Sequence, residues 1–198
     1  TPPPTPHTNT TAKSSAASDV YKRQVHHLLQ TFSFLSFSIS ATTRRPRSSR
    51  EKEGKDYYFL TKEEFLHKVE NGEFIEWEEV YKDIYYGTLR SEVDRIWQEG
   101  KHVLFDVDVK GGIRLKEYFR DNALSVFVKV ADIATLEDRL RHRNTESDMQ
   151  LKKRLSKAAY EMTFESRFDV TLLSTQLSET LAKAEKLTLD YLQHKINP

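Results

Sequence analysis

Residues 38–47 combine hydroxyl and guanidinium side chains at a density that suits phosphate binding. The segment reads Ser-Ile-Ser-Ala-Thr-Thr-Arg-Arg-Pro-Arg and includes Ser40, Arg44 and Arg47. Guanidinium groups bind phosphate oxygens through paired hydrogen bonds, and hydroxyl groups add neutral donors. A cluster this short suits a phosphate monoester better than a long polyanion, which requires many spaced cations. The alternative is a solvated basic turn before a proline.

Carboxylates occupy two places where apolar strands are expected. Asp106 and Asp108 close the apolar run that begins at Val103. Ligands of α/β sheets bind at the carboxyl ends of parallel strands, and an acid there can hold magnesium or its waters. Glu76 lies in the segment Phe-Ile-Glu-Trp at 74–77, where it could accept hydrogen bonds from the two adjacent N–H donors of a guanine edge. The alternatives are solvated aspartates in a turn and an outward-facing glutamate.

Two tyrosines and two cationic runs complete the candidate set. The hydroxyls of Tyr57 and Tyr86 could donate to phosphate, although packing of edge-strand aromatics is an equal alternative. The cationic runs flank a short break at residues 144–145, and helix ends of this kind could close over phosphates. Solvated helix faces would show the same pattern. The runs consist of Arg139, Arg141 and Arg143, and of Lys152, Lys153 and Arg154.

The composition predicts one polar globular domain. The chain has 198 residues, 37% hydrophobic content, no cysteine and a net charge of +1. Its positive charge is concentrated in residues 1–50, so the mildly acidic remainder argues against a nucleic-acid surface. No run is long and apolar enough to cross a membrane, and a signal peptide is only faintly indicated, which favours a cytoplasmic protein. Histidine spacing indicates no zinc site, and the oligomeric state is left open between monomer and homodimer.

Helix and strand patterns alternate after residue 25. Residues 1–24 hold four of the six prolines and few large apolar side chains, so we expect them to be disordered and foreign to the fold. Residues 25–196 are expected to form one domain with a parallel sheet covered by helices. The expected strands are 37–40, 74–80, 84–88, 103–107, 124–130 and 170–173. The expected helices are 25–31, 61–71, 91–99, 111–119, 135–143, 147–164 and 177–192.

Taken in order, these segments resemble guanylate kinase. The resemblance covers residues 25–192 and is most specific at 38–47, at Gly-Lys-Asp-Tyr-Tyr-Phe (54–59), at 74–77, at Tyr-Tyr-Gly-Thr (85–88) and at Asp-Val-Asp (106–108). Several ordered motifs are much harder to meet by chance than one. The resemblance implies an α/β P-loop kinase fold with a mixed β/α GMP-binding insertion at about 38–98 and a helical lid at about 139–160.

The resemblance also implies roles for individual residues. One set would bind the GMP phosphate: Ser40, Arg44, Arg47, Tyr57 and Tyr86. Glu51 would join this pocket if the segment 48–50 contains one inserted residue. Glu76, Thr88 and Asp108 would recognise guanine. Arg143 and Arg154 would face the transferring phosphoryl group, with Arg139 nearby, and Asp106 would lie close to a magnesium ion that enters with ATP.

Three departures from the family pattern concern the ATP side. The lid sequence is His-Arg-Asn-Thr (142–145) where the family usually has Gly-Arg-Gly-Thr, and Leu-Ser-Thr (173–175) replaces Val-Asn-Asp. A P-loop requires G-x-x-x-x-G-K-[ST], yet the first glycine of this chain is Gly54. We therefore expect the first strand and the P-loop to be absent, with a gap in the middle of the sheet. Two functions stay open: a guanylate kinase impaired in turnover, and a non-catalytic module that binds GMP or a protein.

Overall fold

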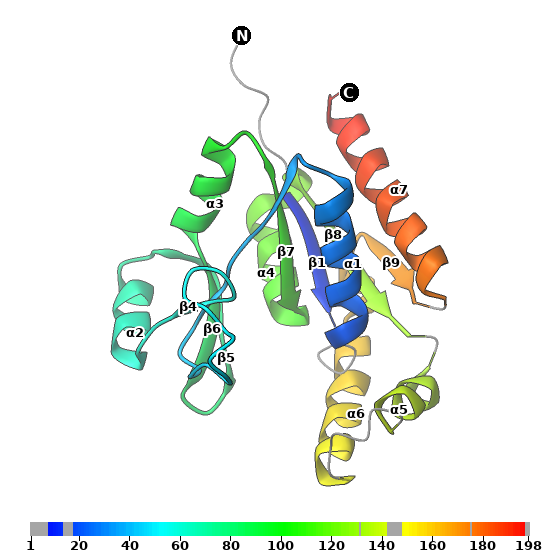
Figure 1. The fold of residues 1–198 in the computed structure, drawn as a ribbon, viewed down its shortest axis with the longest axis horizontal. Helices are drawn as coiled ribbons and strands as arrows, with labels where there is room; N and C mark the ends of the chain where they lie inside the picture. The colour runs from blue at the N-terminus through cyan, green and yellow to red at the C-terminus, as the bar shows by residue number, and fades with distance from the viewer. Residues whose placement is uncertain (1–7, 14–17, 131, 142–147, 175, 197–198) are drawn as a thin grey trace.

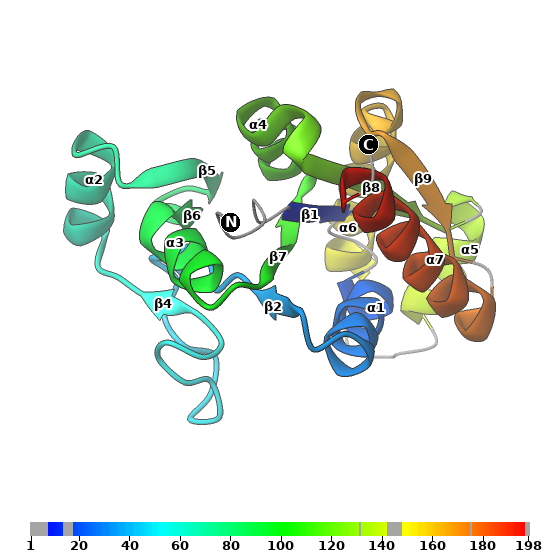
Figure 2. The same cartoon turned by 90° about the horizontal axis from the view of Figure 1, so that it is seen from above.

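The computed structural model describes residues 8–13, 18–130, 132–141, 148–174 and 176–196. These residues form a mixed α/β fold with two sheets (Figures 1 and 2). The first sheet has the order β2-β7-β1-β8-β9, and every pairing in it is parallel. Its strands are β1 (Thr8–Lys13), β2 (Leu35–Phe37), β7 (His102–Asp108), β8 (Ala123–Lys129) and β9 (Val170–Leu173).

The centre of this sheet differs from expectation. β1 lies between β7 and β8, with Thr8 paired to both Val103 and Ala123, so the expected gap does not exist. The prediction of disorder is wrong for these residues and also for the start of α1 (Ser18–Thr31). The flanking strands present buried backbone groups that need partners, and β-branched threonines suit an extended backbone. Backbone pairing therefore places a strand where the side-chain pattern predicts none.

Helices cover both faces of the first sheet. Alternate residues of β7 point to opposite faces: Val103 and Phe105 pack with α3 (Arg90–Gln98) and α4 (Val109–Phe119). Leu104 packs on the other face with α1 and α7 (Leu177–Ile196). Figure 1 shows α1 and α7 on the near side of the sheet and α4 behind it. This two-sided core fixes the strand ends that carry polar residues.

The second sheet lies within the expected insertion. Its order is β4-β3-β6-β5, where β3 and β4 are parallel and the other pairs are antiparallel. Its strands are β3 (Ala41–Thr42), β4 (Tyr58–Phe59), β5 (Phe74–Tyr81) and β6 (Ile84–Leu89). α2 (Lys62–Glu70) begins with a capping box between Thr61 and Glu64 and packs the fully buried Phe65 against the sheet. The insertion therefore has a small core of its own.

Two helices, α5 (Ile133–Arg141) and α6 (Asp148–Met162), occupy the region expected to be the lid. The break expected at residues 144–145 falls outside the described residues. Lys153 of α6 lies over the ring of Tyr81 at the end of β5, 5.2 Å from the ring centroid. α6 thus contacts the insertion through a cation–π interaction. In the described part of the chain, no helix is both long and apolar enough to span a bilayer.

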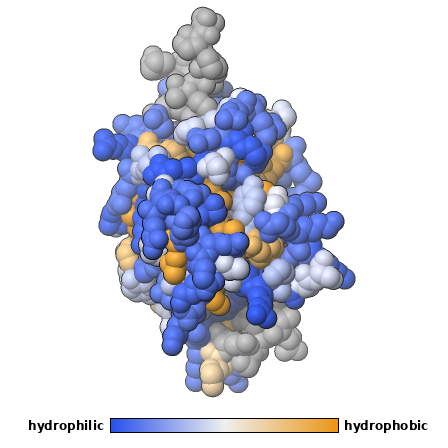
Figure 3. All heavy atoms as spheres, turned by 90° about the vertical axis from the view of Figure 1, so that its left-hand side faces the viewer, coloured by the Kyte–Doolittle hydropathy of each residue, from blue (hydrophilic) through white to orange (hydrophobic). Residues whose placement is uncertain are grey.

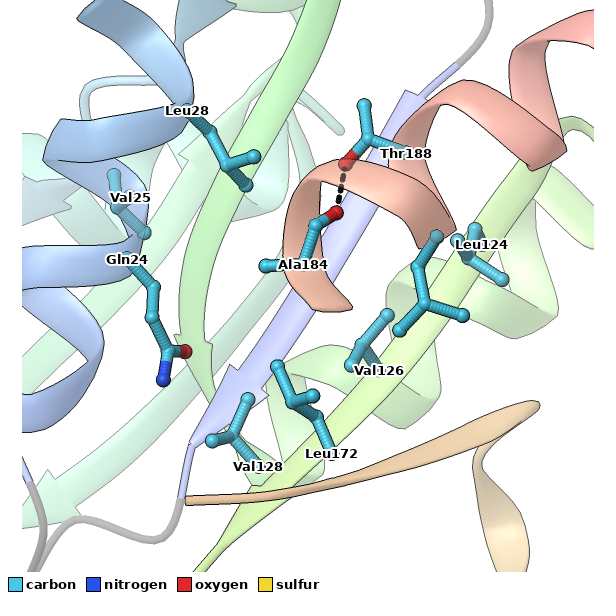
Figure 4. Close-up of a pocket in the computed structure, with 10 residues that line it drawn as sticks. Gln24, Val25, Leu28, Leu124, Val126, Val128, Leu172, Ala184 and Thr188 are labelled. Carbon is cyan, nitrogen blue, oxygen red and sulfur yellow. Dashed lines mark hydrogen bonds between the residues drawn. The ribbon is translucent and has the colours of Figure 1, made fainter. Parts of the chain in front are cut away.

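One core position next to the sheet carries a polar side chain. Gln24 of α1 is 2% exposed, and among the described residues neither its amide nitrogen nor its amide oxygen has a hydrogen-bond partner. Figure 4 shows it with Leu28 on the side of α1 that faces the sheet, close to an apolar pocket lined by Val126 and Leu172. A buried amide without partners costs free energy, so α1 packs less favourably here than an apolar residue would allow.

We expect Gln24→Met to raise the free energy of unfolding by about 1–3 kcal/mol, because it removes a buried unsatisfied amide at similar volume. Urea denaturation measures the change. Gln30, which is exposed on the same helix, supplies the matched control. An equal gain from Gln30→Met, or a loss from Gln24→Met, would contradict the assignment.

Candidate functional site

Five of the candidate residues form a polar cluster at one end of the second sheet, named here the arginine–tyrosine cluster: Arg44, Arg47, Glu51, Tyr57 and Tyr86. Arg44 donates two hydrogen bonds to Glu51, each 3.0 Å long, in a bidentate pair. It also donates to the Tyr86 hydroxyl at 3.2 Å and lies over the Tyr57 ring, 5.1 Å from its centroid. This geometry fixes a cation and two phenol groups around one small region.

Glu51 holds the loop that carries the second arginine. Its carboxylate accepts a 2.6 Å hydrogen bond from the backbone N–H of Arg47. The hydrogen bonds from Arg44, followed by that from Arg47, lower the pKa of Glu51 to about 2, so it stays ionised at any ordinary pH. The sequence expectation placed Glu51 here only if one residue was inserted before it, and the structure does bring Glu51 against Arg44.

The second group lies deeper, in the region where the insertion meets the first sheet, and is named here the Glu76 cluster: Glu76, Thr88, Asp108 and Gly111. Glu76 is 7% exposed and accepts a 2.7 Å hydrogen bond from the Thr88 hydroxyl. The two residues face each other because β5 pairs with β6 at the register Glu76↔Thr88. Burial, which is the largest effect, raises the pKa of Glu76 to about 7, and Asp108 adds to the shift.

A glycine keeps space open between the two carboxylates. Asp108 caps α4 by accepting a 2.8 Å hydrogen bond from the backbone N–H of Gly111. A Cβ atom at Gly111 would lie 3.1 Å from a Glu76 carboxylate oxygen and 3.3 Å from Asp108 Oδ1. A larger residue at position 111 would therefore crowd both acids.

Strand β6 connects the two clusters. Tyr86 belongs to the first and Thr88 to the second, and they are two residues apart on one strand. Alternate residues of a strand point to the same face and are roughly 7 Å apart. The clusters therefore lie on the same face of the second sheet, one around a bidentate arginine and the other around a buried acid. A bound molecule with a phosphate at one end and N–H donors at the other would match both.

The remaining candidates lie elsewhere. Ser40 is half-buried just before β3, where its carbonyl accepts from the backbone N–H of Tyr58 at 3.0 Å. Asp106 lies near the end of β7 and pairs with Thr11 of β1. Arg154 is half-buried on α6, and Arg139 belongs to the helical backbone of α5. Arg143 falls outside the described residues.

Several contacts near the clusters had no sequence signal. Lys110 and Arg114 of α4 both form ion pairs with Glu78 of β5, at 2.8 Å and 2.7 Å. Glu92 of α3 accepts a hydrogen bond from Tyr58 of β4. These charged residues look like ordinary surface residues in the sequence, and only the fold brings them to the insertion. Within the described residues, no group of three or more acidic, histidine or cysteine side chains could hold a metal ion.

Glu76 predicts a specific dependence of stability on pH. Its pKa rises from 4.5 in the unfolded chain to about 7 in the fold, so folding favours the protonated acid. The contribution of Glu76 to stability is thus fully present below pH 4.5, and roughly 3 kcal/mol of it is lost as the pH rises from 4.5 to 7. We expect Glu76→Gln to remove this loss, as measured by urea denaturation across that range. Glu70→Gln, which removes an exposed carboxylate of α2, is the control, and a trend of equal size there would contradict the assignment.

Comparisons with known proteins identify the family of the chain. A family model described as Guanylate kinase matches residues 13–191. Guanylate kinase of Bacteroides thetaiotaomicron is 45% identical over 173 residues, which cover 87% of this chain and 82% of the relative. That of Porphyromonas gingivalis is 44% identical over 158 residues, with coverage of 80% and 84%. The crystal structure of guanylate kinase from Anaplasma phagocytophilum has the same fold, with a TM-score of 0.71 at 24% identity over 98% of this chain and 88% of that one. This chain belongs to the guanylate kinase family.

Proposed function

We propose that the two clusters form a binding site for GMP. The observation that carries the proposal is the shared face of β6, where Tyr86 and Thr88 link a bidentate arginine to a buried acid. The arginine–tyrosine cluster would bind the phosphate together with Ser40. Glu76 would accept hydrogen bonds from the two guanine N–H donors, assisted by Thr88 and Asp108. Adenine lacks this donor pair and would leave the buried acid without partners.

The proposed reaction is phosphoryl transfer from ATP to GMP, which yields ADP and GDP by in-line attack of the GMP phosphate. Magnesium would enter with ATP as part of that substrate. Arg143 and Arg154 would stabilise the charge on the transferring group, with Arg139 nearby, and Asp106 would lie beside the metal. Catalysis of this kind depends on positioning and electrostatics more than on covalent chemistry.

The ATP side of this chain lacks its usual phosphate-binding motif. β1 ends at Lys13 and α1 begins at Ser18, and the sequence from 13 to 24 contains no glycine. A P-loop binds phosphates through close backbone approach, which glycine permits, and through a lysine that follows the last glycine. The residues present do not fit a triphosphate in this way. We infer that the chain binds GMP but transfers phosphate slowly.

A non-catalytic binding module remains the second candidate, because loss of the P-loop motif favours it. Protein-binding surfaces usually carry an apolar centre. The face that carries α2 and α3 is mostly hydrophilic with scattered apolar spots (Figure 3). The bidentate pair of Arg44 and Glu51 and the buried Glu76 are features that GMP binding would use and protein docking would not.

Calorimetric titration with GMP and AMP tests the acceptor site. We expect GMP to bind and AMP to bind at least about 10-fold more weakly, since AMP cannot satisfy Glu76. Arg44→Gln should weaken GMP binding by roughly 10- to 100-fold through loss of charged hydrogen bonds. Arg50→Gln removes an exposed arginine six residues away and should change little. Absence of GMP binding would contradict the proposal and favour the binding module.

Restoring the motif tests the donor site. The combined variant Ser15→Gly, Val20→Gly, Tyr21→Lys and Lys22→Ser creates the P-loop pattern at the junction of β1 and α1. We expect its turnover with ATP, magnesium and GMP to exceed that of the parent chain by at least about 100-fold in a coupled assay. The control omits only Tyr21→Lys and should gain much less. Equal turnover of the parent and the full variant would contradict the inferred impairment.

A further inference from the structure

Glu92 is a charged side chain in an unusual position. It lies on α3, its side chain is 1% exposed, and it belongs to neither cluster. A buried carboxylate is costly unless it is paired and hydrogen-bonded. Glu92 meets this condition through three segments of the chain, because it contacts the backbone of Ile39, the hydroxyl of Tyr58 and the guanidinium of Arg95.

The contacts use both carboxylate oxygens. Oε1 accepts from the backbone N–H of Ile39 at 3.1 Å and from Arg95 Nη2 at 2.9 Å. Oε2 accepts from the Tyr58 hydroxyl at 2.9 Å and from Arg95 Nε at 3.0 Å. Arg95 supplies the opposite charge from the next turn of the same helix, so the buried carboxylate is paired with a guanidinium group. The other two hydrogen bonds to the Glu92 carboxylate come from the segments that contain Ile39 and Tyr58.

In each of those segments, a proposed phosphate-binding residue lies directly beside the residue that contacts Glu92. Ile39 precedes Ser40, and Tyr58 follows Tyr57. Neighbouring residues of an extended chain point in opposite directions. When Glu92 holds Tyr58 on one side of β4, Tyr57 is directed to the other side, where its ring contacts Arg44 and Tyr86. A hydrogen bond from the backbone N–H of Tyr58 to the carbonyl oxygen of Ser40 joins the two segments.

We propose that Glu92 is a positioning residue for the phosphate end of the acceptor site. It binds the segments of Ser40 and Tyr57 to helix α3 through Ile39 and Tyr58, and so sets the placement of phosphate donors that it does not itself touch. This inference rests on the proposed binding of GMP. Guanine recognition by Glu76 and Thr88 does not depend on the contacts of Glu92, because strands β5 and β6 place those two residues.

Because Glu92 connects only to the phosphate end of the site, its positioning role can be distinguished from an effect on overall stability. A loss of overall folding would weaken GMP and guanosine together. A displaced phosphate end would weaken GMP alone, because guanosine lacks the phosphate. The cleanest variant is Tyr58→Phe, which removes one hydroxyl and leaves Glu92 with Arg95 and Ile39.

NMR titration of the full chain with GMP and with guanosine provides the test, since it measures weak dissociation constants. We expect Tyr58→Phe to raise the dissociation constant of GMP by roughly 3- to 10-fold and to leave that of guanosine within about 2-fold. Glu92→Gln should cause a loss of the same kind. Adding Tyr58→Phe to Glu92→Gln should cause little further loss, because both changes act on one connection.

Tyr118→Phe is the matched control. It too removes a hydrogen-bonded tyrosine hydroxyl, which here accepts from Arg90 on an exposed part of α4. It should leave both dissociation constants unchanged. Equal GMP affinity in Tyr58→Phe and the parent chain, or a parallel loss of guanosine affinity, would overturn the positioning role while the proposed function stands. A parent chain that binds guanosine but not GMP, or neither, would contradict the proposed function itself.

Discussion

The pairing register of β6 is the constraint on which the candidate site depends. Glu76 meets Thr88 and Ala41 meets Gly87 because β6 pairs with β5 on one side and β3 on the other. A slip of one residue would turn Tyr86 and Thr88 to the opposite face and separate both clusters from their partners. Gly87 itself fixes this register, because a Cβ there would lie 2.8 Å from the Glu76 carbonyl oxygen. The site therefore exists only in one alignment of three strands.

The two ends of the site have opposite effects on the pKa of the carboxylate that each contains. Glu51 is ionised beside Arg44, and its side chain remains 21% exposed. Glu76 lies where water is excluded, and burial favours its protonated form. A ligand that brings a dianion to the first end and hydrogen-bond donors to the second would compensate both environments. A carboxylate thus pairs with a cation at one end of the site and is a buried hydrogen-bond acceptor at the other.

Local patterns predicted the parts of the fold that depend on neighbouring residues. The helix expected at 61–71, the apolar run of β7 and the motif at 38–47 all follow from short-range chemistry. Glu51 was placed in this pocket by the family resemblance, on the condition of one inserted residue, and the structure shows its hydrogen bond with Arg44. β1 was missed because its polar residues carry no hydrophobic pattern, while its pairing comes from distant strands. Glu92 and Tyr58 were missed for a related reason, since 34 positions separate them in sequence.

The position of β1 has a consequence for the order of folding. Thr8 lies far upstream of its partners in the sheet, which are Val103 and Ala123. A ribosome makes the chain from the N-terminus, so this strand must wait until most of the chain has emerged before it can pair. Parallel pairings between distant segments form slowly, because closing the long intervening loop costs entropy before any contact is gained. The insertion, whose strands lie close in sequence, can form its own core while the central sheet is still open.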